Sequence, residues 1–344
     1  MLKKWIFLFF ILSLFSFSLP LHALEHKGMA LGLFSKDENY SYLDDLKAMR
    51  EMGITHILLL VSWYQHDIKA NELRPLEYDG KNDIYTISDK KLREVISQAH
   101  SVGMQATIFP IIRLEERNGN DWRGLIQPTD FDAWWASYKK FILYYAKIAQ
   151  EEHVDAFSVG SELLSREKDT YQWKDLISDV RKVFKGKLLY SANWDHYNFP
   201  EFWPELDYIG VTAYYEISKT RKPTLAQLTH SWKKIQKQLL KWKNKNYPDK
   251  PFLFTEIGYP SVDGGSMYPW NYFLEGRVDV REQALAYQAF VNTWKKSKDL
   301  AGVYVWVWWG QGGRKDNTYT PRNKPAGKIL EKWYKSESKS ATSG

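Results

Sequence analysis

Apolar and polar positions follow a repeating order along the chain. An apolar run at residues 29–34 is followed by a polar loop, a capping-box sequence at 41–44 and then apolar positions at helical spacing. Gly53 marks the end of this helical segment, and the next apolar run begins shortly after it. The order predicts a β-strand followed by an α-helix.

The same strand-and-helix order recurs over most of the chain. Strands are expected at residues 29–34, 57–61, 106–112, 156–160, 188–192, 208–213, 252–255 and 303–307. Helices are expected at residues 41–52, 88–102, 129–149, 175–184, 225–242, 282–294 and 326–334. No G-x-G-x-x-G fingerprint follows the first strand, which disfavours an open, doubly wound sheet. The pattern therefore predicts an α/β fold, a closed (β/α)8 or TIM barrel.

Length and composition are consistent with one large domain. The chain has 344 residues, and a closed α/β barrel takes roughly 250 residues or more as one unit. Hydrophobic residues make up 44% of the chain and charged residues 26%, so it can bury a sizeable core. We expect the barrel to occupy residues 24–334, with a disordered tail rich in Ser and Lys at 335–344.

The first residues have the layout of a secretory signal peptide. Two lysines precede an uncharged run at residues 5–21, and small residues follow it. The run approaches the roughly 18-residue minimum for a membrane span, so an uncleaved anchor is the alternative. Pro20 and Ala23 favour cleavage. We therefore expect a signal peptide at 1–23 and an exported protein, periplasmic or secreted, that is free of the membrane after cleavage.

Composition excludes several kinds of site and partner. The chain has no cysteine, which excludes disulfides, thiolate metal sites and a lipid-modified cysteine. The eight histidines form no H-E-x-x-H or H-x-H motif, so no metal or other cofactor is expected. A net charge of +7 is small for this length, and the basic residues are scattered, which disfavours nucleic-acid binding. We expect a monomer.

Two of the expected strands end in glutamate. Glu162 follows the fourth strand and Glu256 follows the seventh. Catalytic groups of TIM barrels lie at the C-terminal ends of the strands, and a carboxylate there needs a partner or a function. Two facing carboxyl groups about 5 to 5.5 Å apart are the arrangement by which retaining glycosidases work. The alternative is that each glutamate only pairs with an arginine or lysine of the barrel.

These glutamates look like those of the large barrel clan of retaining glycosidases. More closely, the sequence resembles glycoside hydrolase family 113, a family of β-mannanases and related barrel proteins. The similarity spans roughly residues 28–334. The matching stretches are DWRG at 121–124, FDAWW at 131–135, VGSELL at 159–164, IGVTAYY at 209–215, FTEIGY at 254–259 and TPRNKPA at 320–326. Each stretch is short, and it is their order and spacing that make the match specific.

The resemblance implies a retaining hydrolase of β-linked polysaccharide or oligosaccharide, similar to an endo-β-1,4-mannanase. Glu162 would be the general acid/base and Glu256 the nucleophile. A glycosidase that acts on another β-glycan, of the cell-wall or glucan type, stays open as an alternative. So does a catalytically silent barrel that only binds carbohydrate.

The resemblance also implies two aromatic residues of the site. Tyr214 would donate a hydrogen bond to the nucleophile, and Tyr215 is the adjacent candidate for a place in the site, because strand alternation sends only one of the two inward. Trp308 would form the floor of the subsite in which the sugar is distorted. Trp306 has the same parity and could fill the barrel instead.

One departure from the clan pattern lies next to the acid/base. The clan usually has Asn before this glutamate, where the amide binds the sugar 2-OH in the transition state, and this chain has Ser161. Serine is shorter but can still donate a hydrogen bond, so Ser161 remains a substrate-binding candidate. The substitution is also what leaves the silent barrel open.

Residues at three further strand ends are candidates for the substrate cleft. Trp63, Arg113 and Asn193 follow the second, third and fifth expected strands. The alternative for each is a loop residue that only braces its neighbours by hydrogen bonds.

Overall fold

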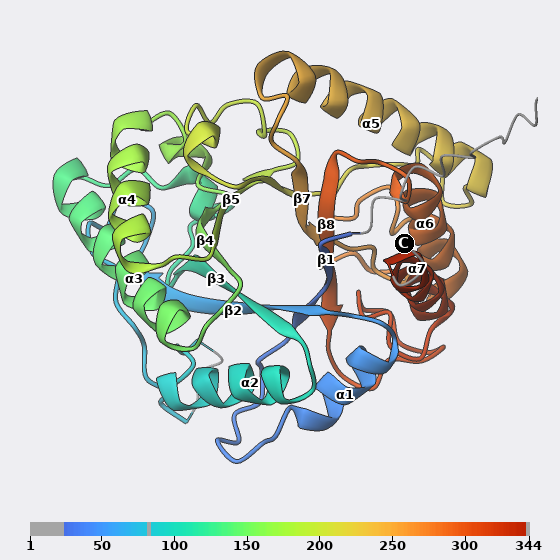
Figure 1. The fold of residues 1–344 in the computed structure, drawn as a ribbon, viewed down its shortest axis with the longest axis horizontal. Coiled ribbons are helices and arrows are strands. Elements are labelled where there is room, and N and C mark those ends of the chain that lie inside the picture. Colours follow the sequence, from blue (N-terminus) through green and yellow to red (C-terminus); the bar gives the residue numbers. More distant parts are fainter. Residues whose placement is uncertain (1–23, 81–83, 342–344) are drawn as a thin grey trace, which may run out of the picture.

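The computed structural model describes residues 24–80 and 84–341 of the chain. Within them, eight parallel strands close into a barrel in sequence order, and the helices surround it (Figure 1). The predicted (β/α)8 barrel is therefore confirmed. The expected signal peptide at residues 1–23 lies outside the described residues.

The elements follow the predicted order. The strands are β1 His26–Leu31, β2 His56–Gln65, β3 Gln105–Leu114, β4 Ala156–Ser161, β5 Lys187–Asn193, β6 Tyr208–Thr212, β7 Phe252–Ile257 and β8 Leu300–Trp308. The α-helices are α1 Leu43–Glu51, α2 Asp89–Ser101, α3 Phe131–Glu151, α4 Thr170–Val183, α5 Leu225–Asn246, α6 Val280–Trp294 and α7 Pro325–Ala341. Three short 3₁₀ helices are η1 Arg123–Leu125, η2 Leu164–Arg166 and η3 Trp203–Glu205. Between β5 and β6 the connection contains η3 and no α-helix.

The helices begin at side chains that cap them. The hydroxyl of Ser88 accepts a hydrogen bond from Lys91 N, as the sequence predicts for α2. At α5 both hydrogen bonds of a capping box are present, between Thr224 and Gln227. At α1 the expected capping box does not form, because the N-cap position is Tyr42, which makes no side-chain cap hydrogen bond.

The C-terminal segment corrects one expectation. Residues from 335 were expected to be disordered, whereas α7 continues to Ala341. This helix packs beside α6 and lies close to β1 and β8 in Figure 1. Tyr334 donates a hydrogen bond from its hydroxyl to the carbonyl of Gly28, which ties the helix to β1. No helix in residues 24–80 and 84–341 is both long and apolar enough to cross a membrane.

Two apolar layers form because successive strand residues point to opposite faces of the sheet. Inside the barrel, Leu58, Phe109, Leu189 and Leu253 belong to one buried cluster. A second and larger cluster fills the space between the strands and the surrounding helices. The direction of a side chain therefore depends on its parity along the strand, and only the inner set can reach the mouth of the barrel.

The barrel interior is polar toward the N-terminal ends of the strands. The ring of His26 makes hydrogen bonds through Nδ1 with the Tyr304 hydroxyl at 2.9 Å and through Nε2 with the Tyr208 hydroxyl at 3.1 Å. Tyr208 donates to Glu25 Oε1 at 2.6 Å, and the Thr107 hydroxyl lies 2.6 Å from that of Tyr304. We call these five residues the floor network. It joins β1, β3, β6 and β8 by side-chain hydrogen bonds.

Candidate active site

The two predicted glutamates meet at the C-terminal mouth of the barrel. Glu162 comes directly after β4, and Glu256 is the fifth residue of β7. Thr212, the last residue of β6, pairs with Glu256 in the sheet and donates from Oγ1 to Glu162 Oε1 at 2.6 Å. The side chains of both glutamates are largely buried. The structure therefore brings the two carboxyl groups into one site.

Glu162 is held by an unusual backbone conformation and by a cation. Its φ of 52° lies in the left-handed region, which costs a non-glycine residue about 1–3 kcal/mol and is common at active sites. The backbone N–H of Glu162 donates to Ser191 O at 2.8 Å, which fixes this turn. The guanidinium of Arg123 in η1 donates to Glu162 Oε2 and forms an ion pair with it.

Glu256 has a different environment. Burial and the nearby charge of Glu162 raise its pKa to about 7, whereas the hydrogen bond from Tyr214 and the charge of Arg123 act in the opposite direction. Tyr214 donates from its hydroxyl to Glu256 Oε2 at 2.8 Å. Burial and the charge of Glu256 hold the pKa of Tyr214 well above its usual range, so the phenol remains a donor. Tyr214 thus makes the hydrogen bond that the sequence predicts.

Sequence and structure comparisons identify the family. The profile of Glycoside Hydrolase Family 113 matches residues 29–324. The chain belongs to this family. As a family 113 member it is a glycoside hydrolase, which agrees with a pair of carboxyl groups at the mouth of the barrel.

Solved family 113 structures have the same fold. A structure described as a GH113 β-1,4-mannanase is 25% identical, with a TM-score of 0.79 over 91% of this chain and 99% of that chain. The GH113 β-mannanase AaManA from Alicyclobacillus acidocaldarius, in complex with ManMIm, is 22% identical, with a TM-score of 0.79 over 91% and 97%. No curated protein sequence gives a significant match.

Two residues that were predicted to bind substrate lie between the strands and the helices, and not in the mouth of the barrel. Trp63 stacks on Phe141 of α3, with ring centroids 5.2 Å apart, and Tyr215 packs edge-on against Trp232 of α5 at 5.6 Å. Both belong to the cluster between strands and helices. Their parity along the chain turns them away from the cleft, so their assignment to substrate binding is corrected.

The two tryptophans of β8 lie on opposite faces of the barrel wall. Trp308 lies in the outer cluster, where its indole Nε1 donates to Asp45 Oδ1 at 3.0 Å. Trp306 packs against the inner cluster and lies beside Gly258, two residues after Glu256 in sequence. Val307 also belongs to the inner cluster, so the alternation of faces is broken between Trp306 and Val307. Trp306 therefore lies on the inner side of β8, where the sequence allowed it to fill the barrel, and Trp308, the predicted site residue, does not.

Ser161 directly precedes Glu162, and Asn193 lies next to Thr212. The hydroxyl of Ser161 is buried and makes no hydrogen bond to any residue that the structure describes. Asn193 Oδ1 accepts from Thr212 Oγ1 at 3.3 Å, and its Nδ2 donates to Asp195 Oδ1 at 2.7 Å. Since Thr212 also contacts Glu162, Asn193 is two hydrogen bonds from the Glu162 carboxylate. Both residues lie where the sequence places them.

Arg113 is exposed near the end of β3. It has the same parity as Phe109 and Ile111, which face the barrel interior, so its position on the strand is compatible with the mouth.

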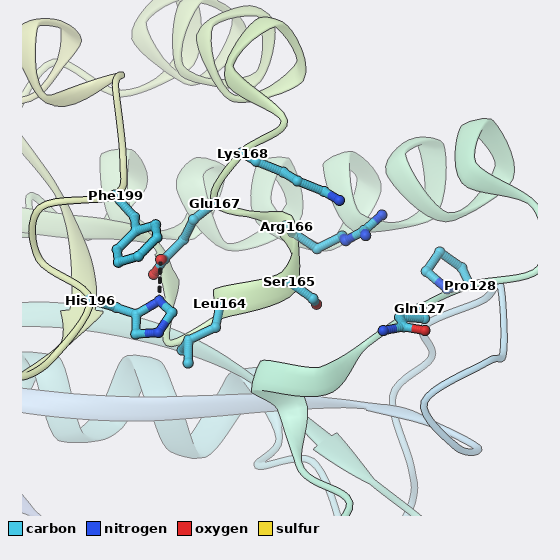
Figure 2. Close-up of a pocket in the computed structure, with 9 residues that line it drawn as sticks. All are labelled: Gln127, Pro128, Leu164, Ser165, Arg166, Glu167, Lys168, His196 and Phe199. Atoms are coloured by element: carbon cyan, nitrogen blue, oxygen red, sulfur yellow. Dashed lines mark ion pairs between the residues drawn. The ribbon is translucent and has the colours of Figure 1, made fainter.

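Sequence reasoning missed four residues beside Glu162. Arg123 and Thr212 contact its carboxylate directly, the charge of Glu162 acts on the pKa of Glu167, and His196 forms an ion pair with Glu167 (Figure 2). Arg123 lies within a stretch that resembles family 113, but nothing in that stretch shows that η1 folds onto the end of β4. His196 lies in the connection after β5, where no periodicity predicts a position.

One group of described residues has the composition of a metal site. His26, His56 and Asp155 offer ligand atoms within 4.8 Å of one another. They lie at the beginnings of β1, β2 and β4, at the end of the barrel opposite the glutamates. Both ring nitrogens of His26 are already engaged in the floor network.

Proposed function

We propose that this family 113 chain is a retaining endo-β-1,4-mannanase. The observation that carries the proposal is the joining of Glu162 and Glu256 through Thr212, with Tyr214 bound to Glu256. Two solved family 113 structures of the same fold are described as β-1,4-mannanases and a third as a β-mannanase, which supports mannan as the polysaccharide.

The reaction would proceed by double displacement. In the first step the carboxylate of Glu256 attacks the anomeric carbon, the glycosidic bond breaks, and Glu162 transfers its proton to the leaving oxygen. In the second step Glu162 takes a proton from water, whose oxygen attacks the same carbon and releases the sugar from Glu256. Both carboxyl groups then return to their initial states.

Three neighbours would assist these steps. The hydroxyl of Tyr214 stabilises the ionised form of Glu256, which is the form that attacks. After Glu162 has given up its proton, the adjacent guanidinium of Arg123 stabilises the carboxylate that remains. The free hydroxyl of Ser161 is available to a sugar hydroxyl at the position where the clan uses Asn.

The test is hydrolysis of a panel of polysaccharides by protein that lacks residues 1–23. We expect new reducing ends from β-mannan, and proton NMR should show the β-anomer as the first product. Glu162→Gln should lower kcat by roughly 10²–10⁴-fold, the usual contribution of a general acid/base. Glu256→Gln should remove turnover.

Each other result selects another hypothesis. The α-anomer as first product contradicts retention, and release from a different β-glycan contradicts mannan as the substrate. Binding without turnover by the wild type supports the silent barrel.

We also propose that residues 1–23 direct export and are removed. The support is the sequence layout of this segment and the position of Leu24, which is buried at the start of the described fold. N-terminal sequencing of the protein from its native host should find Leu24 as the first residue. An intact Met1 on membrane-bound protein would contradict this.

A further inference from the structure

Two histidines and an aspartate converge at the end of the barrel opposite the two glutamates. His26 and His56 are the first residues of β1 and β2, and Asp155 directly precedes β4. Asp155 Oδ2 lies 3.6 Å from His56 Nε2 and 3.9 Å from His26 Nε2. The rings of the two histidines are also close, with centroids 4.3 Å apart. Two imidazole nitrogens therefore lie around one carboxylate oxygen.

The backbone holds these three residues in fixed positions. His26 and His56 belong to strands of the closed barrel, and the carbonyl of Asp155 accepts a hydrogen bond from Lys187 N of β5 at 2.9 Å. Beside His26 the neighbouring strand carries Gly302, where a Cβ would lie only 2.4 Å from the Cβ of His26. Glycine at this position therefore leaves room for the histidine. Groups on strands are held more precisely than groups on loops.

The second nitrogen of each ring is held by a hydroxyl group. His56 Nδ1 lies 2.8 Å from Thr55 Oγ1, and His26 Nδ1 lies 2.9 Å from the hydroxyl of Tyr304. Histidines that bind a metal through one nitrogen almost always donate the other N–H to a partner of this kind, which fixes the ring. Both rings thus have the orientation in which Nε2 serves as the ligand atom.

The floor network allows His26 to release the proton on Nε2. Tyr208 gives its one proton to Glu25, so its oxygen can only accept from His26 Nε2. In the other neutral tautomer, Nδ1–H donates to Tyr304, whose own proton can be donated to Thr107. Nε2 then has a free lone pair for a metal ion, and the bonds to Tyr304 and Thr107 are kept.

The protonation states at this cluster also favour a cation. Burial and the charge of His56 lower the pKa of His26 to about 3, so its ring is neutral. Burial alone would raise the pKa of Asp155, but the contact with His56 and the charges of His26 and Lys187 hold it below its ordinary value. Lys187 is itself paired with Asp207, with Nζ and Oδ1 3.5 Å apart. Neutral imidazole and ionised carboxylate are the forms that bind metals.

The kind of ligand atom and the distances between the atoms indicate zinc. Nitrogen and oxygen ligands at about 2.0–2.2 Å from Zn²⁺ in a tetrahedron lie roughly 3.3–3.5 Å apart. The two distances at Asp155 are slightly longer, so small side-chain rotations suffice. Mg²⁺ and Ca²⁺ prefer oxygen ligands, whereas imidazole suits zinc. The side chain of Asp155 is 34% exposed, which gives the ion and a water ligand a path from the solvent.

We infer that His26, His56 and Asp155 bind one Zn²⁺ ion, with water in the fourth position. The ion joins β1, β2 and β4 at the N-terminal end of the barrel and stabilises the fold. It lies at the end opposite the glutamates, so the inference does not depend on the proposed function. The three ligands are far apart in the sequence, which is why no metal-binding motif contains them.

The experiment titrates Zn²⁺ into metal-stripped protein that carries no polyhistidine tag. Calorimetry should find one ion bound per chain. At about 100 times Kd the ion should raise Tm by on the order of 5 °C, because the ligands meet only in the folded chain. Mg²⁺ at the same concentration should do neither. Co²⁺ in place of Zn²⁺ should give the strong visible absorption of tetrahedral coordination, and a weak octahedral spectrum would contradict the site.

Two conservative variants remove one ligand each and leave the floor network intact. His56→Gln and Asp155→Asn should each weaken Zn²⁺ binding by at least about 100-fold. The matched control is His66→Gln, because His66 Nε2 lies 3.7 Å from Glu116 Oε2 in an exposed pair. This variant should bind zinc like the wild type.

Melting curves in EDTA show that each variant is folded before its affinity is compared. The inference would be overturned by a wild type without saturable binding, by wild-type affinity in both ligand variants, or by a loss confined to His66→Gln. Glycan hydrolysis at room temperature should be equal with and without the ion. A loss of hydrolysis on metal removal from folded protein would contradict a purely structural ion.

Discussion

At the scale of single residues, Tyr214 favours the charged form of Glu256, the proposed nucleophile. Its hydrogen bond lowers the pKa of Glu256, so Tyr214→Phe should raise that pKa. A hydrogen bond to a charged group contributes about 1.5–3 kcal/mol, which corresponds to a shift on the order of one pH unit. The acidic limb of the kcat/KM profile should therefore move to higher pH, and kcat should fall.

The adjacent tyrosine provides the matched control. Tyr215 lies in the outer layer, and its hydroxyl makes no hydrogen bond to any described residue. Tyr215→Phe should leave the pH profile in place. A profile that Tyr214→Phe does not move would show that Glu256 is ionised without help from the phenol.

Glu167 is the buried acid whose titration should affect stability. Its pKa of about 8 in the folded protein exceeds the ordinary value of 4.5 because burial disfavours the charged form. The folded state therefore binds this proton more tightly, and the stability it contributes is present below pH 4.5 and lost as pH rises to about 8. Glu167→Gln cannot ionise, so its free energy of unfolding should fall less between about pH 5 and about pH 9.

Urea denaturation at several pH values measures this difference, which should be on the order of a few kcal/mol. Glu116→Gln, at a side chain that is 68% exposed, is the control. If the free energies of unfolding of the wild type and Glu167→Gln changed equally with pH, the assignment of a bound proton to Glu167 in the folded protein would be contradicted.

The sequence predicts the reacting residues better than their surroundings. Glu162, Glu256 and Tyr214 lie at strand ends, where the barrel architecture itself directs them to the mouth. Trp63, Tyr215 and Trp308 were placed on the wrong face. For Trp308 parity is not a reliable guide, because the register between β1 and β8 shifts between Val305 and Trp308. Trp63 lies where the register of β2 is unbroken, so its outward direction could have been counted from the sequence.

At the scale of elements, the N-termini of α1 and α5 show what a capping pattern can predict. Both have a capping sequence, but only Thr224 of α5 accepts the hydrogen bond from the third residue of its helix. Thr224→Ala should therefore destabilise the protein by about 1 kcal/mol. Ser41→Ala, at the pattern that does not close, should have a smaller effect.

Thermal or urea denaturation of the two variants measures the difference. An equal loss from Ser41→Ala would mean that its hydroxyl, which accepts from Leu43 N at 3.3 Å, stabilises α1 as much as a full cap does.

The order of the elements was predictable because apolar residues recur at regular spacing in the strands and helices that form both apolar layers. The positions of the loops were not predictable, because Arg123 and His196 lie in connections where apolar residues have no regular spacing. The helical part of 335–341 was missed for a related reason: its composition is polar, and composition alone does not show that α7 continues from a packed segment.

At the scale of the whole molecule, the folded unit is larger than the family match. The match begins at residue 29, but His26, Lys27 and Gly28 pair with β8 and close the barrel. A chain that begins at residue 24 should unfold cooperatively on heating. A chain that begins at residue 29 should lose much of its circular dichroism signal, and a native-like transition from it would contradict a requirement for these residues.

The floor network has a consequence for how the barrel opens. Moving β1 away from β8 would break the hydrogen bonds of the buried His26 ring to Tyr304 and Tyr208, at a cost of about 1–3 kcal/mol for each buried group left without a partner. β1 and β8 should therefore not separate while the rest of the barrel stays folded. In hydrogen–deuterium exchange, the amides of β1 and β8 should become labelled together with those of β3 and β6, as one cooperative unit, and only when the entire molecule unfolds.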